Sequence, residues 1–418
     1  MTRRWSGATI AALALTSTLA VAPLAWASAF SITATITTSG TSAPAYANGF
    51  IVQSGSSNVY LFDATSNTLA YTISTPGVSS PQGNVVVGST VYIANQGSNS
   101  VTIVNTAAHT ASVLSTPTCS GPERLINVST RIYVTCTGNA KVIVIDSSTN
   151  TVSTTLSVGL LPRRLSYAGG YVYVPNENSN TVSVITDSAT PSVAANVAVG
   201  TMPVGSAGYG TRAYVVNFTG NSVSVLEGTS VITTIPVGSS PQQDVACGDY
   251  IVVGNRSDGS ATFIDPVTNS VSRTVTGVGG SVTHAVQANA GIAYFGDYSA
   301  NTVTAVDCAS GALAGSITVS GPTDMAFKDS DLGYFPAYYS SPINVASLPA
   351  ASAGGGAGGS ATSSEHRPWM RQVGRSAGQA CEAGWGQSWA EWPNGYTGGW
   401  VCTQSLVWSS ASGQYVLG

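Results

Sequence analysis

The sequence predicts an all-β fold, a β-propeller of four-stranded blades, on the basis of three observations. A repeat of about 40 residues runs from residue 31 to residue 349. Each repeat holds short runs in which apolar and polar residues alternate, with turn residues between them and no helical stretch. A proline recurs at one place in nearly every repeat. Four short strands in a repeat of this length are typical of a propeller blade.

The most recognisable strand of the repeat begins with Tyr and ends with Asn. Its copies are Tyr92–Asn95, Tyr133–Cys136, Tyr173–Asn176 and Tyr214–Asn217, with weaker copies at Phe50–Gln53, Val252–Asn255, Tyr294–Asp297 and Tyr334–Ala337. A turn follows, then an alternating strand such as Asn180–Ile185 and a further strand such as Thr151–Leu156. Alternation with a period of two is the pattern of β-strands.

The number of recurring prolines predicts the number of blades. Proline costs no ladder hydrogen bond at the first residue of a strand, so we expect it to open one strand of each blade. Successive positions are 37 to 41 residues apart, with Val282 standing where one proline would be, and they are Pro44, Pro81, Pro122, Pro162, Pro203, Pro241, Val282 and Pro322. Eight positions predict eight blades, and seven is the alternative if one terminal unit lies outside the ring.

The two ends of the repeat favour a closed ring over an open solenoid. The repeat opens in its last strand, Thr33–Thr37, and stops after its third, Ile343–Leu348. One N-terminal strand would therefore complete the final blade and remove both unpaired edges. A solenoid needs distinctive caps, and the sequence contains none.

Three features of the repeat resemble the YVTN-type β-propeller family. They are the Tyr-x-x-Asn strand, the strand Asn180–Ile185 and the Val-Gly-x-x-Pro connection, and the resemblance covers roughly three quarters of the chain. It implies a bacterial secreted or surface-layer protein, similar in layout to propeller enzymes such as lactonases and streptogramin lyases. Cys136, Asp297 and Ala337 replace the Asn of the pattern, so the turns of the third, seventh and eighth blades are expected to differ.

Charged residues make up only 8 % of the 418 residues, while hydrophobic residues make up 43 %. Strands packed on both faces leave little room for Lys or Glu, which accounts for the low charge. The apolar content excludes a disordered chain. A net charge of −4 without a basic run excludes a protein that binds nucleic acid.

The N-terminus predicts secretion. Residues 1–27 read as a signal peptide, with Arg3 and Arg4 before the apolar stretch Ala8–Ala22 and small residues at the cleavage site. No later apolar run is long enough to cross a membrane, so no span is expected after cleavage. The mature protein is therefore expected outside the cell or at the cell wall.

Six cysteines, an even number, fit an oxidising compartment. Blade geometry predicts a Cys119–Cys136 disulfide because both loops emerge on one face of one blade. Cys381 and Cys402 lie in the same last segment and are expected to pair with each other. By elimination, Cys247 is expected to pair with Cys308. The chain has no Cys-x-x-Cys pair and only three scattered His, so neither a metal nor a cofactor is expected.

The candidate ligand site lies at the mouth of the central channel, where loops and inner strands meet. The residues that follow the opening prolines there are Tyr46, Gln82, Asn84, Glu123, Arg124, Arg163, Arg164, Gly205, Gln242, Gln243, Asp244, His284 and Asp324. In a chain so poor in charge, this concentration predicts a rim that binds an anionic or hydrogen-bonding group. We expect Arg124 and Arg164 to lie opposite His284 and Asp324. The alternative is that these groups only pair with one another or face solvent.

A catalytic role would rest on His284 as a general base, with Asp244 and Asp324 as its carboxylate partners. No nucleophile motif such as Gly-x-Ser-x-Gly and no His-rich metal site accompanies it. The sequence therefore favours a binding or surface-structure protein over a propeller-type lyase or lactonase.

A Gly/Ser/Ala linker, residues 350–364, separates the propeller, residues 30–349, from a Trp-rich module, residues 365–418. The module resembles the short Trp-rich tails of secreted actinobacterial proteins. Four of its tryptophans are candidates for contact with cell-wall polysaccharide or an envelope protein, namely Trp385, Trp389, Trp392 and Trp400. The alternative is that they form the core of the module.

Overall fold

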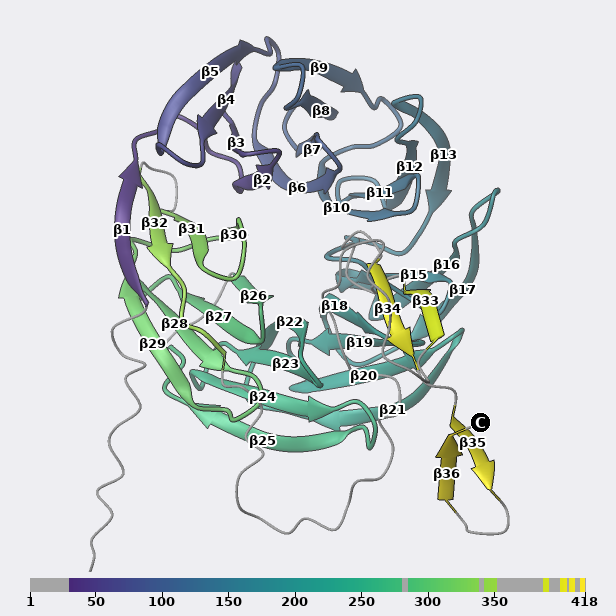
Figure 1. The fold of residues 1–418 in the computed structure, drawn as a ribbon. Helices are drawn as coiled ribbons and strands as arrows, with labels where there is room; N and C mark the ends of the chain where they lie inside the picture. The colour runs from purple at the N-terminus through teal and green to yellow at the C-terminus, as the bar shows by residue number, and fades with distance from the viewer. Residues whose placement is uncertain are drawn as a thin grey trace, which may run out of the picture.

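The computed structural model describes residues 30–279, 285–337 and 342–351, together with the backbone of four short strands in the C-terminal region. Eight four-stranded antiparallel sheets surround a central opening, as Figure 1 shows. The described chain is therefore an eight-bladed propeller. This confirms the predicted fold and the count of eight blades rather than seven.

The first seven blades each use four consecutive strands. Blade 1 consists of β2 (Ala45–Ala47), β3 (Phe50–Ser54), β4 (Asn58–Asp63) and β5 (Thr68–Ser74). Blade 2 consists of β6 (Pro81–Val87), β7 (Thr90–Asn95), β8 (Ser100–Asn105) and β9 (Thr110–Ser115). Blade 3 consists of β10 (Pro122–Val128), β11 (Arg131–Cys136), β12 (Lys141–Asp146) and β13 (Thr151–Ser157). Blade 4 consists of β14 (Ser166–Ala168), β15 (Tyr171–Asn176), β16 (Thr181–Thr186) and β17 (Ser192–Ala198).

The remaining blades follow the same order. Blade 5 consists of β18 (Pro203–Tyr209), β19 (Arg212–Asn217), β20 (Ser222–Glu227) and β21 (Ser230–Pro236). Blade 6 consists of β22 (Pro241–Cys247), β23 (Tyr250–Asn255), β24 (Ser260–Asp265) and β25 (Ser270–Thr276). Blade 7 consists of β26 (Ala285–Asn289), β27 (Ile292–Asp297), β28 (Thr302–Asp307) and β29 (Leu313–Thr318). Blade 8 consists of β30 (Ala326–Phe327), β31 (Leu332–Pro336), β32 (Ile343–Ser347) and β1 (Ser31–Ile36).

Blade 8 closes the ring with strands from both ends of the propeller. β1 pairs antiparallel with β32, in a register that places Ser31 opposite Ser347 and Ile36 opposite Ile343. The expectation that an N-terminal strand completes the last blade is therefore confirmed. In the closed ring, the inner strand of each blade lies at the central opening.

The middle strands of the blades are buried on both faces because neighbouring blades pack against them. Every residue from Ile132 to Cys136 of β11 is buried, whereas exposed and half-buried residues alternate along the outer strand β13. Tyr133 of blade 3 packs in one apolar cluster with Val172 and Ile185 of blade 4. Such sites favour β-branched and aromatic residues, which explains why so few residues of the propeller are charged.

The tyrosine of the repeat ties one blade to the next. Its hydroxyl donates from the second strand of a blade to a side chain in the turn before the outer strand of the following blade. Three of these bonds, at 2.5, 2.7 and 2.7 Å, run from Tyr92 to Asn150, from Tyr133 to Asp187 and from Tyr214 to Asn269. The repeated tyrosine is thus a structural residue.

The asparagine of the repeat holds the turn within its own blade. Asn95 Nδ2 donates to Ser100 Oγ at 3.1 Å and to Thr102 Oγ1 at 2.9 Å. The equivalent amides make the same two kinds of bond at Asn176, Asn217 and Asn255. Where Asp297 replaces Asn, its carboxylate instead accepts two backbone N–H groups of the turn, each at 2.9 Å. The turn after Ala337 lies outside the described residues.

Two disulfides stabilise the propeller. Cys119, in the loop before β10, pairs with Cys136 at the end of β11, and Cys247 of blade 6 pairs with Cys308 of blade 7. Both pairings were predicted from the sequence and are confirmed, and they point to an oxidising or extracellular compartment. The predicted partner of Cys402, Cys381, lies outside the described residues.

The C-terminal region contributes two hairpins whose backbone alone is described. β33 (Gly386–Ala390) pairs with β34 (Gly399–Thr403), which places Trp389 opposite Trp400, and β35 (Leu406–Ser409) pairs with β36 (Gln414–Leu417). Trp385, Trp392 and the signal peptide predicted at residues 1–27 lie outside the described residues. Within the described part of the chain, no helix has the length and apolar character that a bilayer span requires.

Candidate functional site

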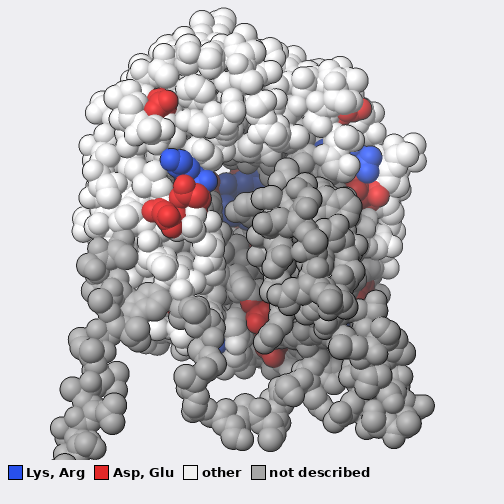
Figure 2. All heavy atoms as spheres, viewed as in Figure 1, with Lys and Arg blue, Asp and Glu red and all other residues white. Residues whose placement is uncertain are grey.

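A central cavity of about 1360 Å³ runs through the ring and is lined by residues from every blade. Basic atoms are visible inside this hollow in Figure 2. Its ionisable lining residues are Arg124, Arg164, Asp244 and Asp324, from blades 3, 4, 6 and 8, with the pair Arg131 and Asp187. One predicted rim residue from each of these four blades therefore faces a common space.

Irregular backbone at the start of the inner strands directs the two arginines. The pairing of β10 with β11 shifts register between Pro122 and Leu125, so Arg124 lies in the irregular section. Arg164 lies between the isolated bridge made by Pro162 and the first residue of β14. Such irregularities re-aim side chains that would otherwise follow the pleat. A glycine at position 83 gives Arg124 room, since a Cβ there would lie 3.4 Å from Arg124 Cδ and 2.8 Å from the Glu123 carbonyl oxygen.

Asp324 binds both arginines. Arg124 Nη1 donates to Asp324 Oδ2 at 2.9 Å, and Arg164 Nη2 donates to Asp324 Oδ1 at 3.1 Å. We expected Arg124 and Arg164 to lie opposite Asp324, and the structure shows that their side chains are long enough to meet it across the opening. About a quarter of each arginine side chain remains open to the cavity.

The ion pairs continue beyond Asp324 as a chain of alternating charges. Glu123 lies 3.6 Å from Arg124 Nε and 3.2 Å from Arg163 Nη1, and Arg163 also pairs with Glu177. The order is therefore Glu177, Arg163, Glu123, Arg124, Asp324 and Arg164, which we call the channel cluster. Arg164 forms one end of it and shares its carboxylate with Arg124.

The electrostatics of the cluster follow from this order. Burial opposes ionisation of Asp324, but the charges of Arg124 and Arg164 outweigh it and lower the pKa of Asp324. Burial also opposes the charge of Arg124, but Asp324 and Glu123 outweigh it and raise the pKa of that guanidinium. At Arg164, burial and then the nearby Arg124 charge lower the pKa. Of Arg124 and Arg164, Arg164 is thus the one whose positive charge its surroundings disfavour.

Asp244 lies beside the cluster and behaves differently. Its Oδ2 accepts the Ala207 N–H at 3.0 Å, whereas its buried Oδ1 has no hydrogen-bond partner among the described residues. Burial raises the pKa of Asp244 to about 8, against the opposing effects of the Ala207 N–H and the Arg164 charge. The carboxyl is therefore mostly protonated and uncharged at pH 7.

Several other predicted rim residues tie blades together. Gln243 Oε1 accepts the Val286 N–H at 2.8 Å and joins blade 6 to blade 7. Asn84 Nδ2 donates to the carbonyl oxygens of Ala43 and Pro44, at 3.0 and 3.2 Å, and joins blade 2 to blade 1. Gln242 Oε1 is buried without a partner among the described residues, and Gln82 is half-buried. His284 lies outside the described residues, so its place beside Asp244 and Asp324 stays a prediction.

Glu177 is the member of the cluster that the sequence reasoning missed. It occupies a single 3₁₀ turn, Glu177–Ser179, directly after the repeat residue Asn176. Blades 2, 3 and 5 carry uncharged residues at the same place, namely Gln96, Thr137 and Phe218, and blade 6 carries Arg256. Glu177 is the one acidic residue at this place in the repeat, and that was the signal that could have identified it.

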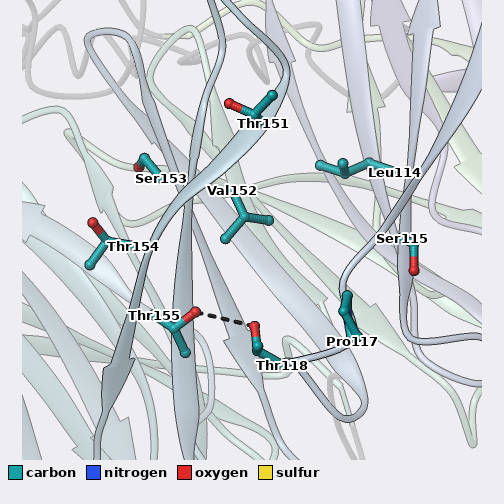
Figure 3. Close-up of a pocket in the computed structure, with 9 residues that line it drawn as sticks. All are labelled: Leu114, Ser115, Pro117, Thr118, Thr151, Val152, Ser153, Thr154 and Thr155. Atoms are coloured by element: carbon teal, nitrogen blue, oxygen red, sulfur yellow. Dashed lines mark hydrogen bonds between the residues drawn. The ribbon is translucent and has the colours of Figure 1, made fainter.

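A smaller pocket of about 390 Å³ lies on the outer wall between β9 and β13. Figure 3 shows that hydroxyl-bearing side chains line it, and Thr118 Oγ1 lies 3.1 Å from Thr155 Oγ1. Its lining has no charged side chain, so the central cavity is the better candidate site. Among the described residues, no group of three or more His, Cys, Asp or Glu is arranged to hold a metal ion.

No protein-family model and no curated protein matches the chain. Among solved structures, it is similar to the computationally designed Ika8 protein, with a TM-score of 0.64 and 13 % identity over 75 % of this chain and 97 % of that chain. A catalytically inactive His-to-Ala variant of virginiamycin B lyase from Staphylococcus aureus with quinupristin has a TM-score of 0.55 and 14 % identity. The similarity covers 66 % of this chain and 97 % of that chain. BamB from Moraxella catarrhalis has a TM-score of 0.60 and 10 % identity, over 76 % of this chain and 100 % of that chain. At these identities the similarity shows a shared β-propeller fold alone.

Proposed function

We propose that this chain is a secreted YVTN-type propeller that acts at the cell envelope as a binding or surface-structure protein. Its central cavity recognises a ligand, and its Trp-rich module, residues 365–418, attaches to cell-wall polysaccharide or an envelope protein. The two disulfides support an extracellular location. The propeller fold is compatible with binding, because its blades form a rigid support for side chains at the channel.

One observation carries the binding proposal. Arg124, Arg164, Asp244 and Asp324 come from four different blades and face the same cavity, in a protein whose residues are only 8 % charged. Binding sites are concave and hold a few convergent polar groups on an otherwise apolar wall. The central cavity has such convergent charged groups, and the outer pocket does not.

The proposal is tested with isolated cell walls and a soluble envelope extract. Four proteins are compared, which are the native protein, Arg124→Ala/Arg164→Ala, a deletion of residues 365–418 and the control Lys141→Ala. We expect the deletion variant to lose binding to the cell walls. Mass spectrometry of the material bound by the native protein identifies the ligand, and we expect the double variant to lose binding of that ligand. Lys141 lies at the start of β12, away from the residues that line the cavity, and its variant should retain both. Retention of all binding by the first two variants would overturn the proposal.

The second candidate function is a propeller-type lyase or lactonase that uses His284 with Asp244 and Asp324. Two observations favour it. The pKa of Asp244, raised to about 8, lies in the range of a general acid at neutral pH. The fold is also shared with virginiamycin B lyase. Turnover of a streptogramin B or a simple lactone by the native protein, with loss of turnover in His284→Ala, would establish the enzyme. Our binding proposal expects no turnover, with or without added divalent metals.

A further inference from the structure

The end of the channel cluster leaves donors unused. Arg164 makes one hydrogen bond to a carboxylate through its guanidinium, from Nη2 to Asp324, and its other guanidinium donors have no acceptor among the described residues. Arg124 shares that carboxylate from the other side. Arg124 also pairs with Glu123, whereas Asp324 is the one carboxylate that Arg164 contacts among the described residues.

Asp244 supplies a second, independent observation. Its side chain is deeply buried, since the residue is only 4 % exposed, and it lines the cavity. Its Oδ1 lacks a partner among the described residues. A buried polar atom without a hydrogen bond is costly, and native proteins rarely keep one without a ligand or water to satisfy it.

Gly205 keeps open the position between these two residues. A Cβ added at Gly205 would lie 3.7 Å from Asp244 Oδ1 and 4.0 Å from Arg164 Cβ. Asp244 and Arg164 therefore border the same position from blades 6 and 4. The equivalent residues of blades 3 and 8 are Arg124 and Asp324, whose long or charged side chains would fill it.

The charges at this position favour a singly charged oxyanion. A protonated Asp244 can satisfy its unpartnered Oδ1 by donating the carboxyl proton in a hydrogen bond. The free guanidinium N–H groups of Arg164 are donors as well. The unused groups of these two side chains are thus donors, which suits a ligand group that accepts hydrogen bonds. A ligand group with one negative charge meets less repulsion from Asp324 than a dianion would.

We propose that the gap between Arg164 and Asp244 binds a carboxylate group of the ligand, which Arg164 pairs with and to which Asp244 donates its carboxyl proton. This inference rests on the proposed binding function of the cavity and names the chemical class of its ligand. Asp324 continues to hold Arg124 when the carboxylate is bound.

Binding by a protonated donor depends on pH. Asp244 faces Arg164 from blade 4 and the Ala207 N–H from blade 5, with Asp324 and Arg124 beyond Arg164. Acetate is fully ionised from pH 6 to pH 9 and the arginines stay charged, so Asp244 is the described group near this position that titrates in that range. Affinity should therefore fall as the pH rises through about 8, by up to about tenfold for each further unit.

The test uses the purified full-length protein and calorimetric titration at pH 6.5 with three probes, sodium acetate, sodium phosphate and the neutral isostere acetamide. We expect saturable binding of one acetate per chain, tighter than phosphate and at least about tenfold tighter than acetamide. Arg164→Gln should weaken acetate binding about tenfold or more. Lys141→Ala is the control and should bind like the native protein.

Two further variants examine the proton. Asp244→Asn keeps a donor but cannot titrate, so it should remove the pH dependence between pH 6.5 and 9, whereas His284→Ala should leave that dependence in place. Absence of acetate binding, equal binding of acetamide, or tighter binding of phosphate would overturn the inference. If acetate fails while capture of the envelope ligand still requires Arg124 and Arg164, the carboxylate assignment falls and the proposed function stands.

Discussion

Arg124 of blade 3 donates a hydrogen bond of 2.9 Å to Asp324 of blade 8, a residue 200 positions later in the chain. Arg164 of blade 4 donates to the other oxygen of the same carboxylate. Blades 3 and 4 are not neighbours of blade 8, so these bonds cross the central opening. The walls of the propeller are held by contacts between adjacent blades, and the cross-channel pairs add a direct tie between opposite walls.

Replacing Asp324 by Asn should destabilise the protein at pH 7, because two arginines would then face each other without their shared anion. We expect a loss of about 1–3 kcal/mol in the free energy of unfolding, since the side chains keep some contact with water. Urea unfolding of Asp324→Asn, Arg124→Gln and the double variant gives the coupling between the pair. A coupling energy near zero would show that the pair contributes nothing to stability.

The Asp324 contribution should also depend on pH. Folding lowers the pKa of Asp324, so its stabilising effect is present above the unfolded pKa and is lost as the pH falls through the folded value. Native protein and Asp324→Asn should therefore converge in stability under acidic conditions. A difference that stays constant down to pH 2 would contradict this.

Asp244 should have the opposite effect on stability. Its pKa is raised to about 8 in the folded protein, so the unfolded chain releases this proton more readily and stability falls as the pH rises from about 4 to about 8. Asp244→Asn removes this cost and should be more stable than the native protein at pH 8, by more than at pH 5. Urea unfolding at pH 5, 6.5, 8 and 9 measures the difference. A difference that does not change with pH would argue against a protonated Asp244.

The two disulfides should differ in their contribution. Cys247 and Cys308 are 61 residues apart, and Cys119 and Cys136 are 17 apart. In the chain-entropy account, the longer loop restricts the unfolded chain more, with values of about 3–5 kcal/mol for loops of these sizes. The variant Cys247→Ala/Cys308→Ala should therefore melt at a lower temperature than Cys119→Ala/Cys136→Ala. The reverse order would show that local packing rather than chain entropy dominates.

The tyrosines of the repeat allow a matched comparison. Tyr133 donates to Asp187 at 2.7 Å, whereas the Tyr294 hydroxyl has no hydrogen-bond partner among the described residues. Tyr133→Phe should lower the free energy of unfolding by about 1–2 kcal/mol, because it leaves a carboxylate with one donor fewer. Tyr294→Phe should have almost no effect or stabilise the protein. Equal losses in both variants would mean that the hydroxyl bond between blades is unimportant.

Closure by β1 is tested with two isoleucines of the same strand. Ile36 is 2 % exposed and Ile32 is 40 % exposed. Ile36→Ala should cost about 2–4 kcal/mol, since it removes a buried side chain between blade 8 and blade 1. Ile32→Ala should cost less than about 1 kcal/mol. Thermal or urea unfolding distinguishes them, and equal small losses would indicate that β1 is dispensable.

The fold could be predicted from the sequence because the repeat determines it locally. Prolines at regular spacing counted the blades, and the incomplete repeats at Thr33–Thr37 and Ile343–Leu348 identified the closing strand. Cys119 and Cys136 could be paired because a blade places their two loops on the same face. Each of these inferences depends on the backbone pattern, which alternation and turn residues encode directly.

The site could be predicted only in part. The position after each proline identified Arg124, Arg164, Asp244 and Asp324, but contacts across the channel depend on its width and on side-chain reach, which no local pattern encodes. The protonation of Asp244 depends on how deeply it is buried, and Glu177 enters the cluster from a turn of the neighbouring strand pair. Sequence thus indicated these four residues among a larger set of candidates, and the three-dimensional structure was needed to show which of them face the cavity and pair.

The shared last blade imposes an order of assembly. β1 is made first, yet its partner β32 ends at Ser347, so more than 300 residues must be synthesised before the two can pair. A chain that leaves the ribosome or a translocation channel from its N-terminus must hold this strand unpaired while blades 1 to 7 form. Ring closure therefore cannot precede the synthesis of β32, and any delay before it leaves the edges of blade 8 free to pair with another chain.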